Sequence, residues 1–319
     1  MSPSDRHQIF VLGIMLLSSA ESLVTNRGAL RASVRRSDWP HACTGYENVP
    51  VVPTNHRAGF VSILGIPNVG KSTLMNALIG EQLSIATSKP QTTRQRIMGI
   101  LNGDDYQIVC SDTPGVLLPQ YKLQEGMMRF VRSSINDADV LMLVVDVFQT
   151  GFPDEQVLRQ LRGSSSSLLV LVNKVDLLSD GSPLSEQRRA ELGTVEELLQ
   201  RWRSEFPDAT VLPLSARKGE GIDDILSYIL ALMPKHPPYF PKDELSDKPE
   251  RFFAAEFLRE AIFEHYREEI PYSCEVEVSS FKESDKIIRI GATIYVSHDR
   301  YVFPLQRHPT RLNISTRAS

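Results

Sequence analysis

The sequence is poor in cysteine, with only 3 among 319 residues, and the cysteines show no paired metal-binding spacing. Cys43, Cys110 and Cys274 are far apart and odd in number, so we expect neither a disulfide framework nor a zinc site. An excess of positive charge is also missing, because the formal net charge is -4. This balance argues against a uniformly basic nucleic-acid binder, although a local basic face can exist within a mildly acidic protein. We expect no DNA partner.

The N-terminal region has no apolar run long enough to span a bilayer as a helix. Residues 9–17 form a short apolar run followed by Ser18-Ser19-Ala20, which resembles a signal peptide with its cleavage site. Residues 24–37 carry Arg, Ser and Ala without any acidic residue, as transit peptides do. We expect residues 1–57 to be a targeting extension addressed to a plastid (chloroplast), with the mitochondrion as the alternative. A wrongly assigned start codon would make this leader meaningless. Contact with a membrane is possible but not indicated.

Short apolar runs alternate with helical stretches between residues 58 and 233. The predicted strands are 60–64, 106–111, 140–145, 168–172 and 211–214, and the predicted helices include 71–79, 123–136 and 222–233. Strands that are buried on both faces appear as continuous apolar runs, so the pattern predicts an α/β domain with a mostly parallel sheet. Residues 234–249 contain five prolines, which predicts a semi-rigid linker and a domain boundary.

A glycine-rich segment follows the first predicted strand and opens a helix. It reads Gly65-Ile66-Pro67-Asn68-Val69-Gly70-Lys71-Ser72-Thr73, the pattern and context of a phosphate-binding P-loop. The glycines would let backbone amides face the phosphates, Lys71 would reach the β- and γ-phosphates, and Ser72 would ligate Mg²⁺. A chance glycine-rich turn is the alternative, and the flanking strand and helix disfavour it.

Two further segments are expected to complete the phosphate and metal site. Asp112-Thr113-Pro114-Gly115 ends a strand, where the carboxylate can hold Mg²⁺ through water and Gly115 can offer its amide to the γ-phosphate. The polar segment 89–96 is the expected first switch region, from which Thr92 or Thr93 would complete the Mg²⁺ shell. Taken alone, the first segment would be a simple turn and the second a surface loop.

Two loops near the end of the domain predict which base is bound. Asn173-Lys174-Val175-Asp176 and Ser215-Ala216 each follow an apolar strand. The Asp176 carboxylate can accept two hydrogen bonds from guanine, which adenine cannot donate, and a backbone amide at Ser215-Ala216 would meet the guanine O6. We therefore expect GTP or GDP with Mg²⁺ as cofactors. The predicted cofactor-binding residues are Gly65, Asn68, Gly70, Lys71, Ser72, Thr73, Asp112, Thr113, Pro114, Gly115, Asn173, Lys174, Asp176, Ser215 and Ala216.

Four stretches together resemble the Era GTPase family, over residues 59 to about 296. They are GIPNVGKSTLMNALIG, KPQTTRQRIMGI, CSDTPGV and YFPKDELSDKPERFFAAEFLREAIFEHYREEIPYS. The last is the most specific, because it resembles the start of the family's C-terminal KH domain. The resemblance implies a P-loop GTPase that binds the 3′ end of small-subunit ribosomal RNA during assembly of the pre-ribosomal subunit. Related GTPases have threonine-arginine in the switch, so Thr93 is our first choice as metal ligand, beside Ser72 and Asp112. Lys71, Thr93 and Gly115 are the expected catalytic residues.

The residue after the Asp-Thr-Pro-Gly segment departs from Ras-like GTPases, which place a water-orienting glutamine there. Val116 cannot form a hydrogen bond with that water, as in the subgroup to which Era belongs, so hydrolysis would rely on P-loop and switch electrostatics. Asn68 matches the P-loop asparagine that helps bind K⁺ in potassium-stimulated relatives. An equally good interpretation is that Asn68 only stabilises the turn.

The C-terminal part of the sequence is expected to form an incomplete α+β KH-like domain of type II. Predicted elements are a helix at 251–268 and strands at 273–281 and 286–296, within a domain of residues 250–297. No glycine follows Gly291, so the GXXG loop that clamps RNA is missing and RNA binding is in doubt. We expect residues 298–319 to be an unstructured or aberrant tail, from a truncated gene model or a divergent short form. Such a half-domain should expose Phe257, Ile262 and Ile288.

These observations leave three functions open. The favoured one is a GTP-hydrolysing assembly factor for an organellar small ribosomal subunit. The second is a GTP-binding regulator that has lost its RNA-binding module. The third is a related GTPase of the TrmE type, against which the KH-like start after the proline-rich segment argues.

Overall fold

The computed structural model of the chain describes residues 7–16, 55–87, 89–90, 92–119, 122–179, 183–267, 269–283, 288–298 and 314–316. The chain divides into two compact units. One comprises residues 32–247, and the other combines residues 1–31 with residues 248–319.

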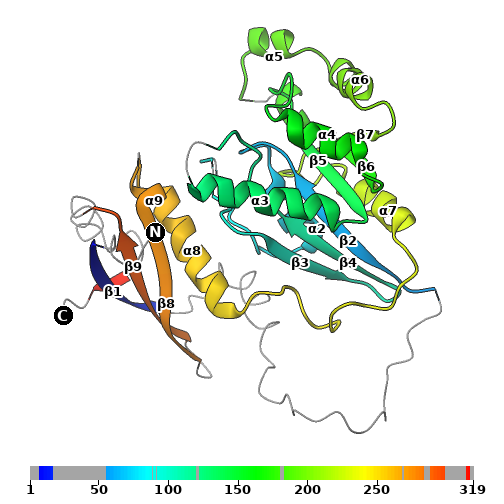
Figure 1. The fold of residues 1–319 in the computed structure, drawn as a ribbon. Coiled ribbons are helices and arrows are strands. Elements are labelled where there is room, and N and C mark those ends of the chain that lie inside the picture. Colours follow the sequence, from blue (N-terminus) through cyan, green and yellow to red (C-terminus); the bar gives the residue numbers. More distant parts are fainter. Residues whose placement is uncertain are drawn as a thin grey trace, which may run out of the picture. The chain divides into compact units, whose positions relative to one another are not determined.

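The first unit is built on a six-stranded sheet (Figure 1). In the spatial order β3-β4-β2-β5-β6-β7, its strands are β3 (Ile97–Asn102), β4 (Tyr106–Asp112), β2 (Arg57–Leu64), β5 (Val140–Asp146), β6 (Ser167–Asn173) and β7 (Thr210–Pro213). All neighbours are parallel except β3, which pairs antiparallel with β4. The predicted α/β class with a mostly parallel sheet is confirmed. The sequence pattern did not reveal β3, which forms the edge of the sheet.

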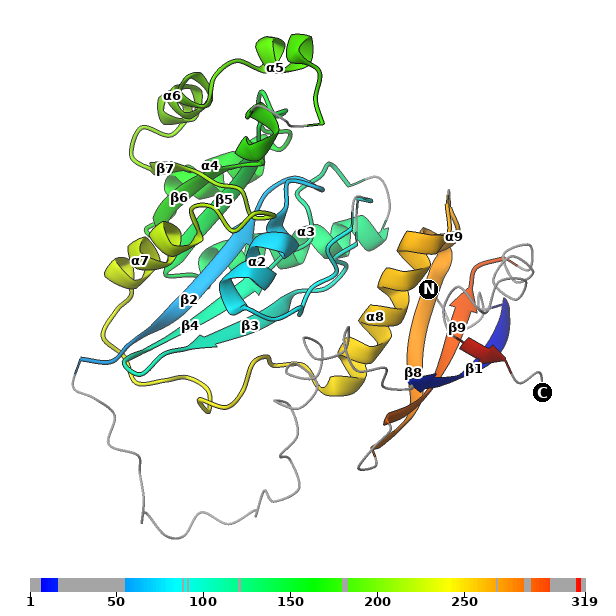
Figure 2. The same ribbon diagram turned by 180° about the vertical axis from the view of Figure 1, so that it is seen from behind.

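Helices cover both faces of this sheet (Figures 1 and 2). On one face lie α2 (Lys71–Ile79) and α7 (Ile222–Leu232), and on the other α3 (Lys122–Asn136), α4 (Glu155–Gly163) and α6 (Val195–Glu205). The unit also contains α5 (Glu186–Leu192) and the 3-10 helix η2 (Val175–Leu178). On the second face, Met128, Leu158 and Trp202 are buried against the central strands. The carboxyl ends of the parallel strands therefore share one edge, where α/β folds place their ligands.

The segment predicted as a linker lies along the first unit's sheet, where it contacts β2, β4 and β3 in turn. The Ile100 amide donates to the Leu245 carbonyl at 2.8 Å. The fully buried side chain of Gln107 donates to the Phe240 carbonyl at 2.8 Å and accepts from the Tyr239 and Phe240 amides at 2.6 and 2.9 Å. An edge strand has unpaired backbone groups, and this proline-rich strap, residues 234–247, supplies partners for them. The two units meet in the chain at residues 247 and 248.

The second unit contains α8 (Glu250–His265), α9 (Ile270–Ser273) and an antiparallel pair, β8 (Cys274–Glu283) and β9 (Ile288–Val296). These elements agree with the expected partial KH-like domain. The expectation that Ile262 would be exposed is wrong, because α8 packs on the strands and buries Ile262 fully beside Cys274 and Ile294. Phe257 and Ile288 are half-buried.

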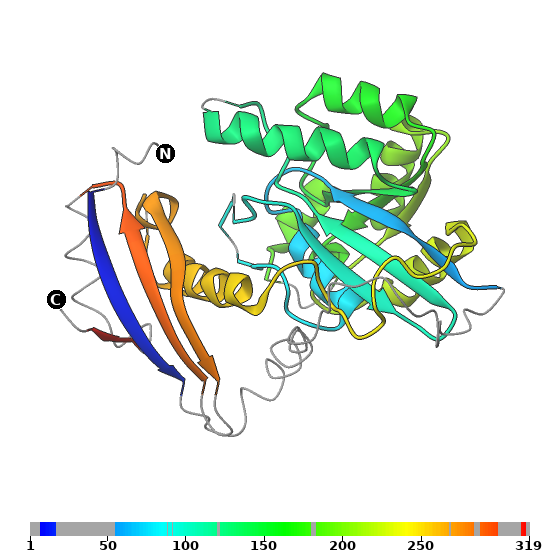
Figure 3. The ribbon, with the colours of Figure 1, turned by 60° about the horizontal axis from the view of Figure 1, so that its bottom comes forward.

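Two terminal segments also join this sheet. In Figure 3, β1 (His7–Leu16) lies beside β9, with which it pairs antiparallel, and β10 (Ile314–Thr316) pairs with β1. The expectation that residues 1–57 and 298–319 lie outside any fold is wrong for these two strands. The edge of β9 offers unpaired backbone groups, and the apolar run of β1 adds to it as a strand. Most of the predicted leader and tail lies outside the described residues, so the targeting hypothesis stays a prediction. Within the described ranges, no helix is long and apolar enough to cross a membrane.

Candidate functional site

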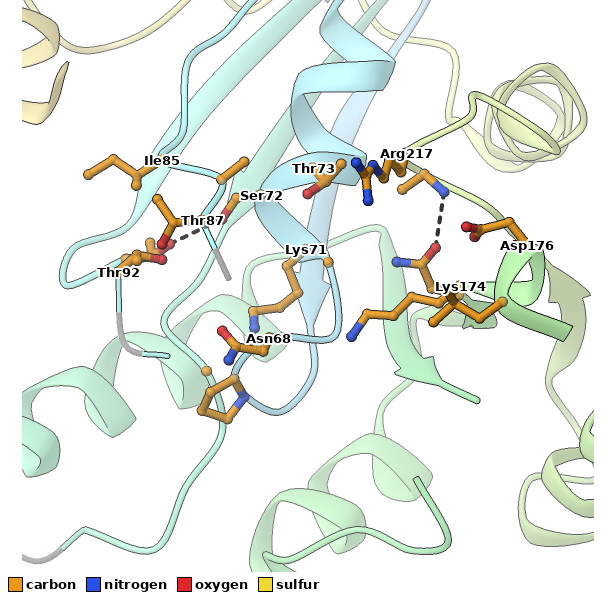
Figure 4. A pocket seen from close by; sticks show the side chains of 18 residues that line it. Asn68, Lys71, Ser72, Thr73, Ile85, Thr87, Thr92, Lys174, Asp176 and Arg217 are labelled. Atoms are coloured by element: carbon orange, nitrogen blue, oxygen red, sulfur yellow. Dashed lines mark hydrogen bonds between the residues drawn. The ribbon is translucent and has the colours of Figure 1, made fainter. Parts of the chain in front are cut away.

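A cavity of about 650 Å³ opens at the carboxyl edge of the first unit's sheet (Figure 4). This volume is typical of sites for nucleotide-sized ligands. The predicted residues that line it are Asn68, Gly70, Lys71, Ser72, Thr73, Thr92, Thr93, Gly115, Asn173, Lys174, Asp176 and Ala216. The fold thus brings together five loops that are far apart in the sequence.

The loop between β2 and α2 forms the floor of the cavity. Gly70 has φ +100°, and a Cβ there would lie 2.3 Å from the Asn173 side-chain nitrogen, so glycine is required. Asn68 also has a positive φ of 65°, a conformation that asparagine tolerates, which agrees with a turn-stabilising role. Helix α2 begins at Lys71, and its unpaired N-terminal amides make the loop a site for anions.

Lys71 carries a cation into the cavity. Its Nζ donates to the Ile66 carbonyl at 2.9 Å. Burial lowers the pKa of Lys71 to about 8, the charge of Asp112 opposes this shift, and the charge of Lys174 adds to it. The ammonium group is therefore poorly solvated and lies where an incoming phosphate would stabilise it.

Behind Lys71, a carboxylate and two hydroxyl groups meet. Ser72 Oγ donates to Asp112 Oδ2 at 2.7 Å, and Thr93 Oγ1 lies 3.2 Å from Ser72 Oγ and 3.5 Å from Asp112 Oδ2. Asp112 is fully buried, and burial raises its pKa, although the charge of Lys71 and nearby hydroxyls oppose the shift. Its Oδ1 accepts no hydrogen bond from the described residues. A buried, unsatisfied carboxylate oxygen beside two hydroxyls fits Mg²⁺, which prefers oxygen ligands and retains waters.

Gly115 closes the cavity from the side of β4. A Cβ there would lie 2.7 Å from the backbone nitrogen of Pro67, so only glycine allows the two loops to approach this closely. The Val116 amide donates to the Gly65 carbonyl at 2.9 Å, and the Val116 side chain is fully buried in the core with Met128. Val116 therefore points away from the cavity, and it cannot contact a water there.

The two loops at the far end of the cavity are joined by hydrogen bonds. Asn173 Nδ2 donates to the Val69 carbonyl at 2.7 Å, and Asn173 Oδ1 accepts from the Ala216 amide at 3.0 Å, which Figure 4 shows as a dashed line. Ser215 Oγ donates to Asp176 Oδ1 at 2.7 Å. This bond orients the Asp176 side chain toward the cavity, and its second carboxylate oxygen, Oδ2, can accept hydrogen bonds from a bound ligand.

Five of the predicted residues do not line the cavity but stand behind it: Gly65, Asp112, Thr113, Pro114 and Ser215. The Thr113 hydroxyl donates to the Ile63 carbonyl at 2.7 Å, so its side chain fastens the loop to β2.

Several lining residues were not singled out in the sequence, namely Pro67, Ile85, Ala86, Thr87, Leu177 and Arg217. Ile85, Ala86 and Thr87 follow a loop that Asn76 holds, because Asn76 Oδ1 accepts from the Leu83 and Ser84 amides at 3.0 and 2.9 Å. No sequence motif signalled Ile85, Ala86 and Thr87, whereas Pro67 lies within the P-loop segment.

Comparison with known proteins settles the family. Residues 60–174 match the family model described as 50S ribosome-binding GTPase. The GTPase Era of Geobacter metallireducens is 40% identical over 246 residues, which cover 76% of this chain and 78% of that protein. The chain belongs to the Era GTPase family. The family resemblance read from the sequence is confirmed.

Other Era proteins extend the comparison. The chloroplastic ERA-like GTPase of rice is 44% identical over 233 residues, which cover 72% of this chain and 52% of that relative. This chain thus spans about half the length of the chloroplastic relatives. Aquifex aeolicus Era, solved with GDP and aluminium fluoride, aligns with a TM-score of 0.62 at 33% identity, covering 72% of this chain and 74% of that one. An Era structure with MgGDPNP and nucleotides 1506–1542 of 16S ribosomal RNA gives the same values.

Proposed function

We propose that this chain binds GTP with Mg²⁺ and hydrolyses it to GDP and phosphate. The observation that carries the proposal is the meeting of Lys71 with Ser72, Thr93 and Asp112 beside a cavity that also contains Asp176. Era structures solved with GDP and with MgGDPNP support the same cofactors. In this proposal Lys71 neutralises the β- and γ-phosphates, while Ser72, Thr93 and the Asp112 carboxylate hold the metal.

The catalytic contribution of the chain is electrostatic positioning. Lys71 and the α2 N-terminus stabilise the charge that develops on the transferred phosphoryl group, and the Gly115 amide holds the γ-phosphate. Val116 orients no water, so intrinsic hydrolysis should be slow. We also propose that K⁺ joins the site at Asn68, which lines the cavity in its left-handed turn.

Base selection is assigned to the far loops. Asp176 would accept hydrogen bonds from N1–H and the exocyclic amine of guanine, and the amide at Ala216 would face O6. The bonds from Asn173 to Val69 and Ala216 keep the base and phosphate ends of the site at a fixed separation. Preorganised donors and acceptors of this kind reject adenine because its edge would leave them unpaired.

The proposed role of the GTPase cycle is small-subunit ribosome assembly through ribosomal RNA, because an Era protein has been solved with a 16S RNA fragment. The charge balance of the second unit argues against strong RNA binding. Residues 250–297 hold ten acidic and six basic residues, a balance that does not favour binding to a phosphate backbone. A GTP-binding regulator with a weak RNA module is the second candidate, and this excess of acidic residues favours it.

We propose a plastid as the site of action. Relatives from maize, rice and Arabidopsis are named chloroplastic, and the arginine-bearing, acid-free segment 24–37 has the composition of a transit peptide. A fluorescent fusion to the first 57 residues tests this directly. Colocalisation with chlorophyll autofluorescence would support it, and a mitochondrial or cytosolic signal would refute it.

The GTPase proposal is tested by phosphate release from Mg²⁺-GTP, with Mg²⁺-ATP as the competing substrate. Lys71→Ala should abolish most turnover and nucleotide affinity, because it removes the phosphate-neutralising cation. Lys235→Ala is the matched control, since Lys235 is an exposed lysine of the same unit outside the cavity. Equal turnover of ATP and GTP, or full activity of Lys71→Ala, would overturn the assignment. A gel-shift with small-subunit RNA separates the two candidate roles.

A further inference from the structure

Lys174 lines the cavity, yet its ammonium group is held by a carboxylate that belongs to none of the expected motifs. Asp146, the last residue of β5, accepts a hydrogen bond from Lys174 Nζ on its Oδ2 at 2.7 Å. The Asp146 side chain is 11% exposed and that of Lys174 30%. Asp146 does not line the cavity itself. The ion pair is thus partly shielded from water, where charge-assisted hydrogen bonds are stronger than on an open surface.

The Asp146 carboxylate is held in one orientation by contacts that do not involve Lys174. Its Oδ1 accepts from the Phe148 amide at 3.1 Å, and its backbone carbonyl accepts from the Gln149 amide at 3.0 Å. The Phe148 ring adds a second contact, with Lys174 Nζ 5.8 Å from its centroid. A tight turn after β5 therefore leaves one carboxylate oxygen to receive the ammonium group.

The other end of Lys174 is fixed as well. Its backbone has φ 66°, a left-handed conformation that is uncommon outside glycine and asparagine and is often found at ligand sites. Between these two fixed ends the aliphatic stem runs along the cavity, from the side of Asp176 toward Lys71 in Figure 4. Lys71 and Lys174 repel each other, so a lysine without a carboxylate partner would swing its charge into the cavity or out to solvent.

We propose that Asp146 is a positioning residue of the nucleotide site: it holds the Lys174 ammonium group aside, so that the methylene stem forms the wall against which the base lies. This inference rests on the proposed function of the cavity as a guanine-nucleotide site. It concerns the face of the base, whereas Asp176 contacts its edge. Asp146 therefore contributes to affinity for the ring and not to the choice among purines with different edges.

The test is a double-mutant cycle on the full chain, measured by titration with fluorescent GDP. Asp146→Asn keeps the acceptor for the Phe148 amide but removes the charge, and it should weaken GDP binding by about tenfold. Lys174→Met keeps an unbranched apolar stem without the ammonium group. In that background Asp146→Asn should change the dissociation constant by less than about twofold, because the partner is already gone. The ratio of GDP to IDP affinity should stay constant, since the two bases differ only at the edge.

Asp139→Asn is the matched control. Asp139 immediately precedes β5 at its opposite end, and it accepts from the Phe60 amide at 2.7 Å without lining the cavity. This variant should bind GDP like the parent chain. Equal losses from Asp146→Asn in both backgrounds would show a role in the turn alone and overturn the inference, as would an unchanged dissociation constant. Failure of the parent chain to bind GDP would instead overturn the proposed function, so the two failures are distinguishable.

Discussion

Replacing Asp176 by asparagine tests the base-reading site most directly. Asp176 Oδ1 already accepts from Ser215 Oγ at 2.7 Å, which fixes the plane of the carboxylate in the cavity. An amide at this position can still accept one hydrogen bond from guanine, but its NH₂ group would face a guanine donor. The variant therefore loses one charge-assisted hydrogen bond and leaves one donor unpaired.

The magnitude follows from these two losses. A hydrogen bond to a charged group contributes about 1.5–3 kcal/mol, and a buried unpaired donor costs about 1–3 kcal/mol. Because Asp176 is only half-buried, the lower ends apply, and their sum of about 2.5 kcal/mol corresponds to a loss of nearly two orders of magnitude in GTP affinity. Xanthosine triphosphate has an oxygen where guanine has its amine, so Asp176→Asn should bind it better than the parent does.

Competition of unlabelled nucleotides against fluorescent GDP measures both affinities in one assay. Ser215→Ala is a useful companion variant, because it removes the orienting hydroxyl and leaves the carboxylate. It should weaken GTP binding modestly without favouring xanthosine triphosphate. If Asp176→Asn retained the parent preference for GTP over xanthosine triphosphate, Asp176 would not be the residue that recognises the base.

Three further predictions concern other parts of the first unit. Above pH 8 nucleotide binding should weaken by about tenfold per pH unit, because the pKa of Lys71 is lowered to about 8. The neutral amine must then take up a proton before it can bind phosphate. A nucleotide affinity that is independent of pH up to about 9 would contradict this prediction. Val116→Ala should lower the free energy of unfolding by about 1–2 kcal/mol in denaturant titrations, since the side chain is fully buried, and should change hydrolysis little; a large loss of turnover in the folded variant would show a direct catalytic role. Potassium should stimulate hydrolysis more than sodium, and Asn68→Ala should remove the difference, whereas equal rates in both salts would eliminate the ion site.

Much of this protein could be predicted from the sequence alone. Strands β2, β4, β5 and β6 are continuous apolar runs because both faces of the sheet are covered, and this pattern is visible without a structure. The P-loop and the segment from Asn173 to Asp176 are contiguous, and their chemistry depends on local backbone conformation, as at Gly70 and Lys174. Local motifs of this kind carry their own geometry, so they suffice to predict a nucleotide class.

Tertiary structure decided what depends on neighbours far apart in the sequence. Strand β3 pairs through its backbone at the sheet edge, so it shows no periodic side-chain pattern. The proline-rich strap is held by the Ile100 amide of β3 and by the buried Gln107 of β4, contacts that its own sequence does not reveal. Ile262 is buried because α8 folds onto β8 and β9, which the composition of a half-domain does not reveal. Asp146 becomes part of the nucleotide site only because parallel pairing of β5 with β6 sets its carboxylate beside Lys174. The sequence alone determined which chemistry is present, and the packing of strands decided which residues support it.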